Sequence, residues 1–114
     1  MSAHAHDDQE PKPTPDEILT LQRLFLVHLL RNGSGCIDDI TEADRLNRKY
    51  PGTSGNFRGG ALAGLSGRKL IARTGELVVT RRPWRHCFRN PVWCCPDANR
   101  VMAFLRATDP ARTD

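Results

Sequence analysis

The stretch TRRPWRHCFRNPVW, residues 80–93, carries four arginines, one histidine and two tryptophans between two short apolar runs. Arginine presents a charged, planar fork of N–H donors that fits phosphate oxygens, and a loop tryptophan can lie against a sugar or support the loop. Pro83 stiffens the segment and limits the entropy lost when it docks. These residue types indicate a loop that contacts phosphate; the alternative is a basic loop that is merely solvated.

The charge of the whole chain is unevenly distributed. Residues 1–57 hold 6 Lys and Arg against 9 Asp and Glu, a net charge of −3, whereas residues 58–114 hold 11 against 4, a net charge of +7. Such a split predicts a polyanionic partner for the second half. Charge alone does not distinguish nucleic acid from an anionic membrane surface.

The composition is that of a small globular protein. A chain of 114 residues with 39% hydrophobic and 26% charged residues is typical of one globular domain. It has no apolar run of eighteen residues, and its N-terminus is polar and acidic, so we expect a cytoplasmic protein with no membrane partner. Four cysteines without a regular spacing are expected to be reduced thiols.

The first half of the chain must supply the helices that position the basic segment. Residues 1–13 predict a disordered tail, and the TPDE sequence at 14–17 predicts a capped helix that runs to about residue 32. One wide face of this helix is apolar and contains Ile18, Leu19, Leu21, Phe25, Leu26, Leu29 and Leu30. A face of this width predicts two neighbours: the core, and either the last helix or a second subunit.

Two further helices are expected before the basic segment. After a short strand at Cys36 and Ile37, a helix capped by Asp38 or Thr41 should end near Lys49, before Pro51. A third helix at 57–70 should turn Phe57, Ala61, Leu62, Leu65 and Leu70 inward. Its four glycines (Gly59, Gly60, Gly64 and Gly67) each cost about 1 kcal/mol relative to alanine and would allow another helix or a phosphate backbone to approach closely.

The remaining elements form a hairpin and a last helix. We expect a turn at Thr74–Gly75, strands at 76–80 and 91–95 with the basic loop between them, and Trp93 as a core anchor. A helix capped by Asp97 should follow, with Ala98, Val101, Met102 and Leu105 on one face. The predicted organisation is therefore a tail at 1–13, one domain at 14–108 and a tail at 109–114.

This order of elements predicts an α+β fold of the winged helix-turn-helix type, with three helices, a β-hairpin wing and a C-terminal helix. In that architecture the third helix lies in the major groove of DNA, and the wing reaches along the backbone or into the minor groove. The sequence GRKLIARTGELVVTRRPWRHCFRNPVW resembles small winged-helix proteins of phages and other mobile elements. The resemblance covers about residues 56–93 and implies this fold and DNA binding; Gly59, Gly60 and Gly64 depart from the pattern and do not favour base-specific reading.

The predicted function is a DNA-binding protein, either a transcriptional regulator or a replication accessory factor, with no catalytic activity, cofactor or metal. The contacts, mostly to the backbone of duplex DNA, are assigned to Arg58, Arg68, Lys69, Arg73, Arg81, Arg82, Trp84, Arg85, His86 and Arg89. Four to six phosphate contacts predict a salt slope of about −4 to −5. An unpaired module of this size would bind at roughly micromolar affinity or weaker, and a homodimer through the first or last helix would tighten binding.

Other chemistries remain open alternatives at this stage. His86 and Cys87 could meet Cys94, Cys95 or Cys36 around zinc, although adjacent cysteines on a strand point to opposite faces. A Cys–His nucleophile pair would need an orienting third group, which the sequence does not indicate. The main alternative function is a winged-helix adaptor that binds protein through the apolar face of the first helix.

Overall fold

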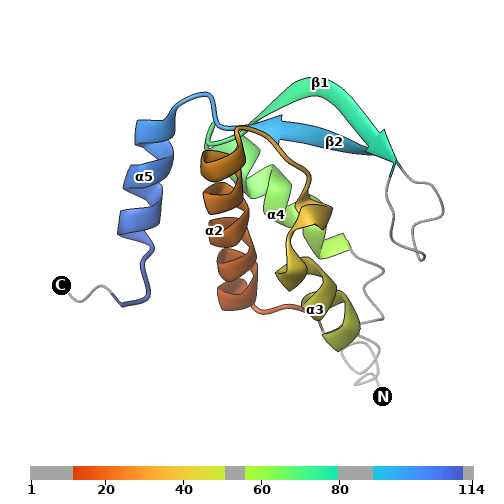
Figure 1. The fold of residues 1–114 in the computed structure, drawn as a ribbon. Coiled ribbons are helices and arrows are strands. Elements are labelled where there is room, and N and C mark those ends of the chain that lie inside the picture. Colours follow the sequence, from red (N-terminus) through yellow and green to blue (C-terminus); the bar gives the residue numbers. More distant parts are fainter. Residues whose placement is uncertain (1–11, 51–55, 80–88, 112–114) are drawn as a thin grey trace, which may run out of the picture.

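The computed structural model describes residues 12–50, 56–79 and 89–111, and over them the fold is α+β, as predicted (Figure 1). Four α-helices accompany one antiparallel hairpin of two strands in these ranges. The elements in chain order are α2 (Pro15–Asn32), the 3₁₀ turn η1 (Ile37–Asp39), α3 (Thr41–Lys49), α4 (Asn56–Gly67), β1 (Ala72–Val79), β2 (Arg89–Cys94) and α5 (Ala98–Ala107).

The first helix begins where its capping sequence predicts. The Thr14 hydroxyl accepts a hydrogen bond from the Glu17 amide at 3.2 Å, and a carboxylate oxygen of Glu17 accepts one from the Thr14 amide at 2.9 Å. This reciprocal capping box satisfies two of the amides that a helix start leaves unbonded. The helix ends at Gly33, which adopts a φ of 86° that a side chain would strain.

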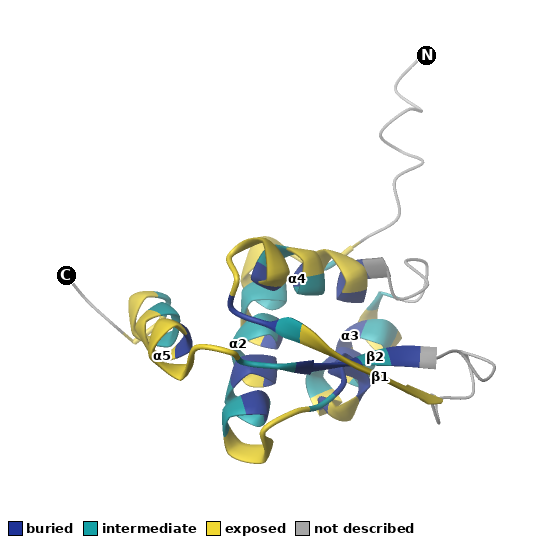
Figure 2. Cartoon of the chain, turned by 90° about the horizontal axis from the view of Figure 1, so that it is seen from above, coloured by how far each residue is buried: buried dark blue, intermediate teal, exposed yellow. Residues whose placement is uncertain are grey.

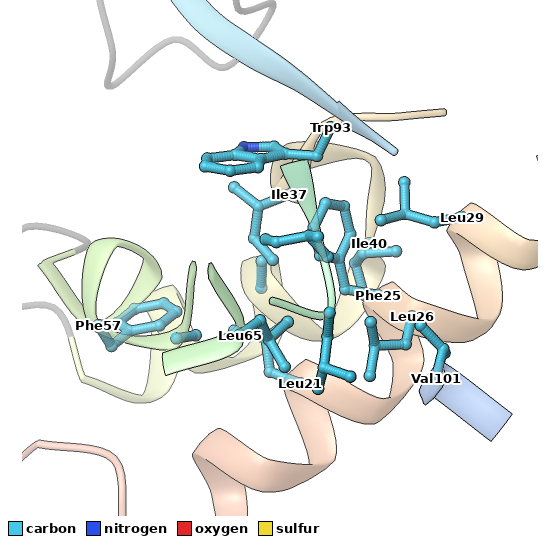
Figure 3. Close-up of a cluster of buried hydrophobic side chains, with 14 of the residues drawn as sticks. Leu21, Phe25, Leu26, Leu29, Ile37, Ile40, Phe57, Leu65, Trp93 and Val101 are labelled. Carbon is cyan, nitrogen blue, oxygen red and sulfur yellow. The ribbon is translucent and has the colours of Figure 1, made fainter. Parts of the chain in front are cut away.

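The apolar face of α2 packs against two neighbours, as its width predicts. Its central residues, among them Phe25 and Leu26, are fully buried in the core (Figure 3). The second neighbour is α5, whose Val101 is fully buried and whose end is held by two 2.6 Å hydrogen bonds from Arg23, to the Leu105 carbonyl and the Thr108 hydroxyl. Of the two candidates for the second neighbour of this face, the last helix and a second subunit, the structure shows the last helix, α5.

The apolar face predicted for α5 is buried only in part. Val101 faces inward and Asp97 caps the helix by accepting a hydrogen bond from the Arg100 amide, as expected. Met102, however, is 46% exposed and Ala98 is exposed, because α5 touches α2 along a narrow line at one side of the molecule (Figure 2).

One buried cluster joins all the helices to β2. It contains Leu21 and Phe25 of α2, Leu46 of α3 and Leu65 of α4, and the indole of Trp93 closes it from the hairpin (Figure 3). Trp93 is 7% exposed, which confirms its prediction as a core anchor. Burying a large apolar side chain contributes about 1.5–3 kcal/mol, so Trp93 fastens the hairpin to the helical layer.

The short strand predicted at Cys36 and Ile37 lies one residue earlier. Gly35 forms an isolated antiparallel bridge with Trp93, in which its amide donates to the Trp93 carbonyl at 3.0 Å and its carbonyl accepts from the Trp93 amide at 2.9 Å. The extended segment ends there, and the 3₁₀ turn η1 begins at Ile37. The Asp39 side chain stabilises the start of this turn by accepting a hydrogen bond from the Cys36 amide. The bridge places this segment along the edge of β2.

The turn predicted at Thr74–Gly75 is wrong. These residues lie inside β1, which pairs with β2 on both sides of them, at Arg73↔Trp93 and at Leu77↔Pro91. Three residues of β1 thus face the single residue Val92, and the φ of 97° at Gly75 accommodates the bulge. The bulge bends the hairpin where it leaves the helical layer.

Candidate nucleic-acid interface

The outward face of α4 consists of small residues. Phe57, Ala61 and Leu65 are buried, while Gly59, Gly60, Ala63, Ser66 and Gly67 are exposed. A Cβ atom added at Gly59, Gly60 or Gly67 would meet no atom within 4 Å among the described residues. Packing among the described residues therefore does not require glycine at these three positions. The exposed face of the helix carries no long side chain there.

Gly64 differs from these three glycines. A Cβ atom there would lie 2.9 Å from Nε2 of Gln22, and this amide donates a 3.1 Å hydrogen bond to the Ala61 carbonyl. Gly64 therefore serves the close contact between α2 and α4, one of the two uses that the glycine-rich sequence predicts.

The third helix is shorter than predicted and ends in a Schellman motif. The helix proper stops at Gly67, the Lys69 amide donates to the Ser66 carbonyl at 2.9 Å, and the Leu70 amide donates to the Leu65 carbonyl at 3.0 Å. Lys69 adopts a φ of 61°, the left-handed conformation that glycine usually supplies at this position. The chain thus carries glycines within α4 and a lysine where glycine is the usual residue.

Three predicted contact residues gather just after α4. Arg68, Lys69 and Arg73 are all exposed. The guanidinium of Arg68 lies over the Phe104 ring at 5.6 Å, and that of Arg73 lies over Trp93 at 5.4 Å. Stacking of this kind orients a guanidinium while leaving its charge accessible. We call Arg68, Lys69 and Arg73 the basic corner.

Arg100 of α5 also reaches the basic corner, and the sequence analysis did not identify it. It is exposed, and its Nη1 donates a 3.5 Å hydrogen bond to the Arg68 carbonyl. Its sequence signal is weak, since an arginine in the first turn of a helix is common on solvated surfaces. The docking of α5 against α2 brings Arg100 within reach of the Arg68 carbonyl.

Arg58 does not belong to an exposed surface, contrary to its predicted role. It is 3% exposed, and its Nε lies 2.9 Å from Oδ1 of Asp38 in an ion pair. Asn90 of β2 donates a 2.9 Å hydrogen bond to the other oxygen of the same carboxylate. The ion pair with Asp38 keeps Arg58 buried, where it cannot contact phosphate. The Asp38 carboxylate also links three elements, η1, α4 and β2.

The other predicted contacts cannot be placed in the same way. Arg81, Arg82, Trp84, Arg85 and His86 lie outside the described residues. Arg89 is the first residue of β2, and its backbone is described.

The described cysteines, Cys36, Cys94 and Cys95, are free thiols. Burial, followed by the nearby Asp39 and Asp38 charges, raises the pKa of Cys36 to about 11, and burial raises the pKa of Cys95 to about 11. A thiol with such a pKa stays protonated at neutral pH and is a poor nucleophile. Within the described ranges no three histidine, cysteine or acidic side chains form a metal-ligand group; His86 and Cys87 fall outside those ranges.

Comparison of the chain with protein-family models, curated proteins and solved structures finds no match. None of the helices in the described part of the chain is both long enough and apolar enough to cross a membrane.

Proposed function

We propose that the chain is a winged-helix DNA-binding protein, with α4 as the recognition helix and the β1–β2 hairpin as the wing. The order of elements supports this assignment, because α2, the Gly35 bridge, α3, α4 and the hairpin follow one another as they do in winged-helix domains. The resemblance of residues 56–93 to small winged-helix proteins of mobile elements points the same way. The protein would act as a transcriptional regulator or as a replication accessory factor.

The observation that carries the proposal is the conformation of Lys69. A left-handed conformation costs a non-glycine residue roughly 1–2 kcal/mol, and a protein tends to retain such strain where the side chain has a use. Lys69 stands in the sequence between the exposed Arg68 and Arg73, so three exposed positive side chains follow closely on the end of α4. A phosphate backbone is the partner that such a corner fits best.

The proposed contact is mostly to the DNA backbone. The outward face of α4 carries glycine, alanine and serine, which offer few donors long enough to reach base edges. Small residues allow the helix to approach the duplex closely, while the basic corner and the arginines of residues 80–89 supply the charge. Affinity should therefore depend steeply on salt and weakly on sequence.

The test is fluorescence anisotropy with a random-sequence duplex at several salt concentrations, using a variant that combines Arg68→Ala, Lys69→Ala and Arg73→Ala. Loss of three phosphate contacts should make the salt slope shallower by about 2.7. The control combines Arg31→Ala and Arg48→Ala, which removes exposed charges on α2 and α3. Equal loss of affinity in the two variants would refute the basic corner as the contact surface.

A second variant addresses the predicted wing loop, with Arg81→Ala, Arg82→Ala and Arg85→Ala combined. It should weaken binding to the duplex without changing the thermal unfolding midpoint. Unchanged affinity would remove the loop from the proposed interface and leave the basic corner to be judged by its own variant.

The adaptor alternative has less support from the geometry of α2. The apolar residues on which it relied are largely covered by the core and by α5. The exposed large apolar residues near that face are Leu24 and Met102, at 44% and 46%. Two such side chains are normal on the surface of a monomer.

A further inference from the structure

A groove of about 650 Å³ lies on the hairpin, away from the basic corner. One side is the segment between Ser34 and Asp39, and the other is β1 from Glu76 to Val79. Asn90 and Val92 of β2 lie between the two sides, because β2 pairs with β1 along one edge and with Gly35 along the other.

The described lining of the groove is acidic, in a chain that is basic overall. It contains three carboxylates and neither lysine nor arginine, whereas the net charge of the chain is +4. Asp38 is neutralised from inside by Arg58. Asp39 lies with its Oδ2 3.5 Å from Nε2 of His28, but its side chain is still 51% exposed, and Glu76 is exposed. Such a lining repels phosphate and favours a ligand with positive charge.

The β1 side of the groove is apolar and uncovered. Leu77, Val78 and Val79 are 56%, 43% and 55% exposed, and in the described sheet β1 pairs with β2 along one edge and has no strand along the other. Consecutive exposed β-branched and leucine residues on an edge strand are uncommon, because they favour association with another chain. Val78 lies opposite Asn90 in the register, so its side chain and the groove share one face of the hairpin.

We propose that this groove binds an extended segment of a partner protein in which basic side chains alternate with apolar ones. Side chains of an extended chain alternate in direction with a spacing that matches a strand-lined groove. The apolar side chains would cover Val78 and Val92, and the basic ones would meet Asp39 and Glu76. The acidic described lining would repel a nucleic acid. The groove lies on the hairpin that is the proposed wing, and its described lining contains none of the residues of the basic corner.

The experiment is an amide-shift NMR titration of the full chain with the peptide acetyl-Lys-Val-Lys-Val-Lys-Val-amide. Two matched peptides serve as controls: one with serine in place of valine, and one with glutamate in place of lysine. We expect the lysine–valine peptide to shift the amides of residues 34–39 and 76–79, and both controls to bind at least about tenfold more weakly, as loss of either complementarity implies.

Matched variants separate the groove from general charge attraction. Glu76→Lys should weaken binding about fivefold to tenfold, as expected when a partly exposed attraction becomes a repulsion, whereas Asp109→Lys on the C-terminal segment, with the same change in charge, should not. Equal binding of the serine peptide, or shifts outside the groove, would overturn the proposal. A third result would also overturn it. If the amides of residues 76–79 shift with protein concentration in the absence of peptide, and Val78→Ser abolishes these shifts, the surface binds a second copy of the chain.

Discussion

The two ends of α4 use arginine in opposite ways. At the first turn Arg58 is buried and paired with Asp38, whereas just past the last turn Arg68 is exposed and lies over the ring of Phe104. In the sequence, both arginines look alike as basic residues of the predicted third helix. The difference shows that a carboxylate from another element determines whether an arginine becomes part of the core or part of a surface.

The largest expected effect comes from breaking the buried pair. Asp38→Ala should lower the free energy of unfolding by about 3–5 kcal/mol, since it leaves the guanidinium of Arg58 buried without its carboxylate. Arg68→Ala should change it by less than about 1 kcal/mol, as is usual for an exposed residue. Urea denaturation measures both values.

A double variant sharpens this comparison. Combining Asp38→Ala with Arg58→Met replaces the pair by apolar groups and should recover much of the lost stability. If the double variant loses as much unfolding free energy as the two single variants, Asp38→Ala and Arg58→Met, lose together, the two side chains act separately.

The glycines of α4 provide the next comparison. Gly60→Ala should stabilise the protein by about 1 kcal/mol, because alanine favours the helix and its Cβ meets open space. Gly64→Ala should stabilise it less, because the new Cβ displaces the Gln22 amide from the Ala61 carbonyl. Thermal unfolding of the two variants under identical conditions tests this order, and a larger gain at Gly64 would contradict it.

Lys69→Gly is expected to separate stability from binding. Glycine relieves the left-handed conformation, and we expect a gain of about 0.5–1 kcal/mol in unfolding free energy. The same change removes one charge of the basic corner and should weaken DNA binding. Lys69→Asn, which tolerates this conformation but is neutral, should bind as weakly as the glycine variant; wild-type affinity in either would refute a role for the lysine.

The smallest effect concerns the contact between α2 and α3. Hydrogen bonds from Lys49 (2.7 Å), Tyr50 (2.6 Å) and the Thr14 amide lower the pKa of Glu17 from 4.5 to about 2. Because the folded state holds the lower pKa, this contribution is present above pH 4.5 and is lost as the pH falls towards 2. Glu17→Gln should therefore show a shallower loss of stability between pH 5 and 2; parallel curves would contradict the assignment.

Local signals predicted much of the fold. The capping box at Thr14, the Asp97 cap and the apolar face of α2 lie within single elements, and the structure confirms them. The turn assigned to Thr74–Gly75 was wrong because pairing with β2 on both sides overrides the local preference of these residues. The burial of Arg58 depends on a carboxylate twenty residues away, and the place of Arg100 depends on how α5 docks.

The most direct test of the proposed function is an NMR titration of the labelled chain with a random-sequence duplex at low salt. We predict that the largest amide shifts fall on α4 and the basic corner, residues 59–73, and that they disappear as salt is raised. Shifts confined to α2 and α5, or shifts that persist at high salt, would contradict DNA binding through this surface, and the absence of any shift at low salt would favour a protein partner.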